Sequence, residues 1–264
     1  IPGSVGIPGN IALQNAGSIR NKGFEFQISS NIINKKDFKW NSRLGIFTNK
    51  GKVLDVVGTT IHSGTVNPAG TSLNTAIVEA GRPLGSFFGL ISEGVDPATG
   101  KIKYKDLNND GVIDGNDETI IGSANPKYSF GFSNSLSYKN FTLDIYFQGV
   151  QGNQILNATK ILTESMSLPM NQSASVLHRW RNPGDITDIP GVSPDNWDNS
   201  AFSTRYIEDG SYVRLKSVTF GYRVNNNTIK KLKASSCLVY VTAENLLTFT
   251  KYSGFDPEVS MFNA

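Results

Sequence analysis

An acidic stretch, residues 106–117, holds the side chains best suited to bind a metal ion. Its sequence, DLNNDGVIDGND, places carboxylate or amide oxygens at positions 1, 3, 5, 9 and 12, and a glycine at position 6. Calcium-binding loops use this spacing to surround a hard cation with oxygen, and the backbone carbonyl of position 7 adds a ligand. We therefore predict a Ca²⁺ site with the ligands Asp106, Asn108, Asp110, Val112, Asp114 and Asp117.

Two features of this loop keep a second interpretation open. Asp117 stands where a calcium loop usually has glutamate, so its shorter arm would offer one oxygen or require a tighter cage. The flanking segments KIKYK and TIIG are typical of strands, whereas the loop in an EF-hand joins two helices. The alternative is a solvated turn that uses aspartate and asparagine for their turn chemistry.

The segments that must position this loop are long strands of alternating polarity. Residues 127–138, KYSFGFSNSLSY, place aromatic and aliphatic side chains on one face and serine or glycine on the other. After Lys139 and Asn140, residues 141–149, FTLDIYFQG, alternate again, which predicts a hairpin. Further strands are predicted in GFEFQIS, DFKWNSRLGIF, SYVRLKSVTFGYRV and CLVYVTAENLLTFT; the faces of the last are not separable. The apolar phase slips between Leu215 and Val218, which predicts a β-bulge.

The lengths of these strands and of their connections favour a membrane barrel. A strand that crosses a bilayer needs about 9–11 residues, whereas strands of soluble proteins centre on about 5–6. Short connections alternate with long runs, residues 54–101 and 149–205, as expected for tight periplasmic turns and long extracellular loops. Asp144 and Gln148 would then face a wet lumen. A soluble sandwich with one core face and one solvent face is the alternative.

Composition and isolated motifs exclude several other classes of function. Net charge is +3 without a basic stripe, so nucleic acid is not an expected partner. The single cysteine, Cys237, excludes an internal disulfide. Neither histidine has a partner at zinc-ligand spacing, and no nucleophile elbow is present, so we do not expect an enzyme. Trp180 is expected to pack within a loop, and Glu208 with Asp209 to form a polar turn.

Six strings, in order along nearly the whole chain, resemble the SusC/RagA family of TonB-dependent outer-membrane transporters. They are NAGSIRNKGFEFQIS, GRPLGSFFGLISEGV, residues 106–153, HRWRNPGD, RYIEDGSYVRLKSVTFGYRV and AENLLTFTKYSGFDPEV. The resemblance implies an all-β fold in which residues 1–264 form the C-terminal part of a 22-stranded antiparallel transmembrane β-barrel with long extracellular loops. It also implies that the plug domain, the TonB box and the final strand lie outside these residues.

The same resemblance implies a function. The protein would import oligosaccharides or peptides across the bacterial outer membrane, contacting lipid with its wall. A SusD-like surface lipoprotein would act as a lid, and TonB would supply energy through the N-terminal part. The calcium loop would lie at an extracellular connection and rigidify it. The alternative from a different class is a soluble calcium-dependent β-sandwich adhesin or glycan-binding module.

Overall fold

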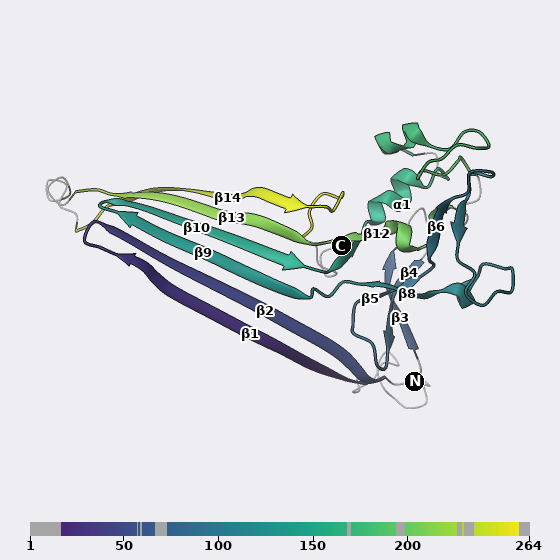
Figure 1. Ribbon diagram of the computed structural model, residues 1–264, viewed down its shortest axis with the longest axis horizontal. Coiled ribbons are helices and arrows are strands. Elements are labelled where there is room, and N and C mark those ends of the chain that lie inside the picture. Colours follow the sequence, from purple (N-terminus) through teal and green to yellow (C-terminus); the bar gives the residue numbers. More distant parts are fainter. Residues whose placement is uncertain are drawn as a thin grey trace, which may run out of the picture.

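The main feature of the computed structural model is one antiparallel sheet of six strands, hereafter the wall (Figure 1). The structure describes residues 17–56, 58, 60–66, 73–167, 170–193, 199–225, 229 and 235–258. The strands follow the order β1-β2-β9-β10-β13-β14. Their bounds are β1 (Gly17–Asn34), β2 (Phe38–Val56), β9 (Tyr128–Tyr138), β10 (Phe141–Gln151), β13 (Tyr212–Arg223) and β14 (Leu238–Thr250). The predicted hairpin of β9 and β10 is confirmed, with Phe141 opposite Tyr138.

The register of the wall aligns a row of apolar side chains from each of the six strands on one face. Phe132 lies opposite Leu44 on one side and Phe147 on the other. The one amide in this row of β9, Asn134, accepts a hydrogen bond from Trp40 Nε1 at 3.0 Å. No second sheet covers this apolar face in the described part of the chain (Figure 1), and many of its large side chains are exposed, including Phe24, Phe26, Ile28, Tyr138, Phe141, Phe220 and Val241. The wall is therefore not half of a two-layer sandwich, and that alternative is wrong.

The connections differ sharply between the two ends of the wall. At one end β9 and β10 are joined by Lys139 and Asn140, and Lys139 takes a left-handed backbone with φ 51°. Residues 35–37 join β1 to β2 at the same end, while the β13–β14 connection lies partly outside the described residues. At the other end, residues 57–127 and 152–211 connect the strands, and the described residues among them form a second body, hereafter the loop unit (Figure 1). The predicted alternation of short and long connections is confirmed.

The long connections are more ordered than their composition indicates. A four-stranded sheet contains β3 (Thr60–Val66), β4 (Leu73–Glu79), β5 (Ser86–Gly89) and β8 (Thr119–Ser123). Two small pairs join β6 (Ser92–Val95) to β7 (Ile102–Tyr104) and β11 (Gln154–Leu156) to β12 (Ile207–Asp209). Helical segments within the described residues include α1 (Ala158–Glu164) and the 3₁₀ segments η4 (Gly115–Asp117), η5 (Ala174–His178) and η6 (Thr204–Tyr206). Strands this short carry too few alternations to stand out in the sequence.

The loop unit holds much of the buried apolar core. The buried residues of the loop unit include Ile77, Leu90, Ile161, Phe202 and Tyr206.

The predicted bulge in the wall is confirmed, because β13 shifts register against both β10 and β14 between Leu215 and Ser217. Among the described residues, no helix is both long enough and apolar enough to cross a membrane.

Candidate functional site

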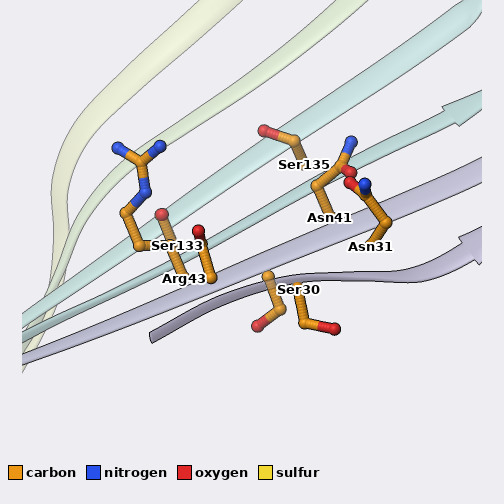
Figure 2. Close-up of a pocket in the computed structure, with 8 residues that line it drawn as sticks. Ser30, Asn31, Asn41, Arg43, Ser133 and Ser135 are labelled. Carbon is orange, nitrogen blue, oxygen red and sulfur yellow. The ribbon is translucent and has the colours of Figure 1, made fainter. Parts of the chain in front are cut away.

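The polar face of the wall carries hydrogen-bonding side chains from several strands. Figure 2 shows an open hollow of about 370 Å³ at β1, β2 and β9; Asn31, Asn41, Arg43, Ser133 and Ser135 point to one side of the strands, whereas Ser30 points to the other. On the next strand, Asp144 accepts a hydrogen bond from Ser135 Oγ. This places the predicted lumen residue Asp144 on the polar face. The surface offers hydrogen-bond donors and acceptors to a polar solute.

The end of the polar face nearest the loop unit carries a cluster of charges. Arg214 of β13 is only 5% exposed, and its guanidinium donates to Asp256 Oδ1 at 2.6 Å and to Glu258 Oε2 at 2.7 Å. Lys216 Nζ also donates to Glu258 Oε2, at 2.7 Å. Gln148 Nε2, the second predicted lumen residue, lies 3.5 Å from Glu258 Oε1. Sequence reasoning missed this cluster because charged residues separated by more than forty positions give no periodic signal.

A second polar junction lies inside the loop unit, around Glu208 of β12. Its Oε1 accepts from Lys160 Nζ of α1 at 2.9 Å and from Asn157 Nδ2 at 3.1 Å, and its Oε2 accepts from Ser253 N at 2.7 Å. Burial alone would raise the pKa of this carboxyl, but the hydrogen bonds from Lys160, Ser253 and Asn157 outweigh burial and lower it. The predicted polar turn is therefore only half right. Asp209 caps the turn through Ser211 N, whereas Glu208 joins three segments.

The acidic loop, residues 106–117, lies between β7 and β8 in the loop unit, which confirms its strand context. The backbone winds around its acidic side chains. Asp106 accepts from the N–H groups of Asn109 and Gly111 at 2.6 and 2.8 Å. Asp110 accepts from Val112 N at 2.8 Å. Gly111 has φ +82°, the left-handed conformation that glycine adopts at no steric cost.

Asp117 closes the acidic loop from its last position. The residue is 0% exposed, and it accepts from Leu107 N at 2.7 Å and from Asp114 N at 3.0 Å. These N–H groups, that of Asp114 first and that of Leu107 second, lower the pKa of the Asp117 carboxyl. Asp114 in turn caps η4 by accepting from Asn116 N at 2.7 Å.

The acidic loop has the oxygen donors that calcium prefers, but its carboxylate oxygens do not converge on one point. Each N–H bond occupies one lone pair of a carboxylate oxygen and leaves others for a cation. Within the described residues, however, no three histidine, cysteine, aspartate or glutamate side chains are grouped closely enough to hold a metal ion. The predicted ligand set therefore stays a prediction.

The remaining sequence expectations concern packing in the loop unit. Trp180 Nε1 donates to the carbonyl of Pro97 at 2.9 Å, and its ring covers Gly100, where an added Cβ would come within 2.4 Å of the ring. The predicted loop-packing role of Trp180 is therefore confirmed. In the same hairpin, Asp96 accepts from Ala98 N at 2.9 Å and from Thr99 Oγ1 at 2.9 Å, so GVDPATGK forms a turn between β6 and β7.

The architecture as a whole defines the class of protein. A single antiparallel wall with an exposed apolar face, a polar face, tight turns at one end and elaborate connections at the other is the arrangement of an outer-membrane β-barrel. No family model matches the sequence. Curated relatives do match it, and they are TonB-dependent receptors.

The relatives agree on one type of receptor. TonB-dependent receptors P3 and P26 of Formosa agariphila are 34% and 33% identical over 95% and 96% of this chain. SusC of Bacteroides thetaiotaomicron is 26% identical over 93% of it. A solved structure of the RagAB peptide transporter matches 98% of this chain with 27% sequence identity and a TM-score of 0.79. The match covers 28% of the chain in that structure. The chain belongs to the SusC/RagA type of TonB-dependent receptors of the bacterial outer membrane. It spans 26%, 27% and 25% of the lengths of P3, P26 and SusC.

Proposed function

We propose that the receptor containing this chain imports oligosaccharides or peptides across the outer membrane, energised by TonB. The two-faced wall carries this proposal, because its apolar face suits lipid and its polar face suits a hydrated passage. The likeness to SusC and to the RagAB peptide transporter supports transport rather than catalysis. This chain supplies part of the barrel wall and the loop unit at its extracellular end.

We further propose that a SusD-like surface lipoprotein partners the receptor at that end. The support is the likeness to RagAB, whose solved structures are described as a peptide importer in open and closed states. Because this chain spans only 25–27% of the lengths of P3, P26 and SusC, cargo and TonB contacts of the whole receptor would also involve residues beyond it.

Transport can be tested in the living cell by deleting the receptor gene. We expect the deletion strain to lose uptake of a fluorescent peptide pool or of an oligosaccharide pool, and the complete gene to restore it. A proton uncoupler should abolish the same uptake, because TonB draws on the proton-motive force. Unchanged uptake of both pools would contradict the proposal, as would recovery of the receptor in the soluble fraction without detergent.

We also propose that the acidic loop binds Ca²⁺ and thereby rigidifies the connection between β7 and β8. The support is the spacing of its oxygen ligands, its wound backbone and the low pKa of Asp117, which keeps that carboxylate charged. Asp106, Asn108, Asp110, Asp114 and Asp117 would supply side-chain oxygens, and Val112 its carbonyl. Millimolar calcium outside a cell is enough for a weak extracellular site.

Calcium binding should appear as heat in titration calorimetry and as a higher melting temperature of the purified receptor. At ten times the dissociation constant the stabilisation is about 1.4 kcal/mol. Asp110→Ala should abolish both effects, because it removes a carboxylate at the centre of the loop. Asp37→Ala, in the β1–β2 turn at the opposite end of the wall, is the matched control and should leave both intact. The calcium proposal would be contradicted if the parent receptor gave no heat, or if Asp110→Ala gave as much heat as Asp37→Ala.

A further inference from the structure

The segment after β14, residues 251–258, turns back toward the polar face of the wall (Figure 1); we name it the strap. Its far end is held by Arg214, whose Nη2 donates to Asp256 and whose Nη1 donates to Glu258. The remaining nitrogen, Nε, donates to Thr248 Oγ1 at 2.9 Å, and the guanidinium lies over the Tyr212 ring. All three nitrogens of a nearly buried cation are therefore satisfied, and two of them by the strap.

The Arg214 side chain is far less exposed than the two carboxylates of the strap that it binds. The Arg214 side chain is 6% exposed, whereas those of Asp256 and Glu258 are 52% and 35% exposed. Asp256 and Glu258 contact the guanidinium directly, so the strap provides part of the cover over Arg214 as well as its counter-charges. Two charge-assisted hydrogen bonds therefore favour the closed strap.

The near end of the strap is held by the loop unit. Ser253 donates through its N–H to Glu208 Oε2 at 2.7 Å and through its hydroxyl to Glu208 Oε1 at 2.8 Å. Glu208 also binds Lys160 and Asn157 at the start of α1. The strap therefore joins two bodies, with one anchor on the wall and one on the loop unit.

The stretch between the two anchors is tightly fitted. The ring of Tyr252 lies over Gly254, where an added Cβ would come within 2.4 Å of it, so a side chain at position 254 would have to displace the ring. Phe255 follows and is fully exposed. Phe255 therefore does not hold the segment through burial, whereas Pro257 is buried between the two polar partners of Arg214.

We propose that the strap is a latch that fixes the loop unit to the polar face of the wall. Arg214 is its positioning residue on the wall, and Glu208 is the corresponding residue on the loop unit. When the latch is closed, the two bodies move together. When Arg214 releases Asp256 and Glu258, the far end of the strap can leave the polar face, while its near end stays joined to β14 by the chain and to the loop unit through Ser253.

Trypsin offers a direct test on the intact receptor purified in detergent, because Lys251 lies in the strap. Cleavage after Lys251 requires local release of the segment, so its rate reports how often the latch opens. Arg214→Met removes the cation without leaving a buried charge. We expect cleavage after Lys251 to accelerate at least about tenfold, the equivalent of losing about 1.4 kcal/mol of closure.

Three further variants separate a latch from a general loss of stability. Lys216→Met removes only a half-exposed partner of Glu258 and should change the rate less than about threefold. Arg214→Lys can pair with one carboxylate and should give an intermediate rate. Asp256→Asn combined with Glu258→Gln should give the same cleavage rate after Lys251 as Arg214→Met, although Arg214 itself is intact.

The internal reference is cleavage after Arg181, an exposed site in the loop unit distant in sequence from the strap. Its rate should stay unchanged in every variant. Equal rates after Lys251 in Arg214→Met and the parent receptor would overturn the latch, and so would a parallel rise after Arg181. Neither result depends on cargo uptake, so the latch and the transport proposal can fail separately.

Discussion

Replacement of Phe132 by arginine should strongly reduce the amount of receptor assembled in the outer membrane. Phe132 lies at the middle of β9 on the apolar face, between Leu44 and Phe147. A charged arginine on the lipid-facing side of a barrel costs about 2–4 kcal/mol near the bilayer midplane. This is a large part of the stability of an ordinary domain. The measurement is the fraction of folded receptor in isolated outer membranes. It is read from a gel, because a folded barrel migrates differently in boiled and unboiled samples.

The matched control is Ser135→Arg on the same strand. Ser135 belongs to the polar face and pairs with Asp144 of β10, so a cation there meets water and a carboxylate. We expect nearly normal assembly of this variant. If Ser135→Arg were the more damaging of the two, the assignment of the lipid-facing side would be reversed. Equal assembly of both would mean that neither face contacts lipid.

Replacement of Tyr206 by alanine should unfold the loop unit while the wall stays assembled. Tyr206 is 0% exposed at the end of η6, and its hydroxyl donates to the carbonyl of Asn199. Burial raises the pKa of this phenol to about 12, so it remains a neutral donor at any physiological pH. Truncating a buried aromatic side chain to alanine costs about 3–5 kcal/mol through lost contacts and the cavity that remains.

Hydrogen exchange of backbone amides, read separately in the two bodies, measures this effect. Amides of α1 and β11 should lose protection in Tyr206→Ala, while those of β9 and β10 keep theirs. Tyr206→Phe keeps the ring and leaves only the Asn199 carbonyl without its partner, so about 1–3 kcal/mol is expected. A uniform loss across the wall would show that the two bodies unfold as one unit, contrary to this expectation.

The wall can be predicted from the sequence because every long strand repeats one simple rule. Two-residue periodicity over eleven positions is enough by itself to assign Phe130 and Ser133 to opposite faces. The slip in apolar phase after Leu215 locates the bulge in the same way. In β14 the two faces are not separable by periodicity, because apolar side chains occur on consecutive positions such as Val239, Tyr240 and Val241, all of them exposed.

The loop unit and the strap cannot be predicted in the same way. Strands of three to seven residues leave little periodicity, and their pairing depends on contacts between distant segments. Glu208 illustrates the limit: in the sequence it is one acid beside another, whereas its role follows from the meeting of α1, β12 and the strap. The acidic loop can be located from the sequence because its signal is local spacing. Whether a cation holds it depends on solution chemistry that spacing alone does not define.

The unequal ends of the wall have a consequence for biogenesis. Lys139 and Asn140 close one hairpin with almost no chain, whereas residues 57–127 and 152–211 form a folded body at the opposite end. In the proposed orientation, in which the loop unit lies outside the cell, both long segments must cross the outer membrane while the small turns stay on the periplasmic side. We therefore expect the loop unit to complete its folding only after it reaches the cell surface, because a folded four-stranded sheet is bulkier than an extended chain.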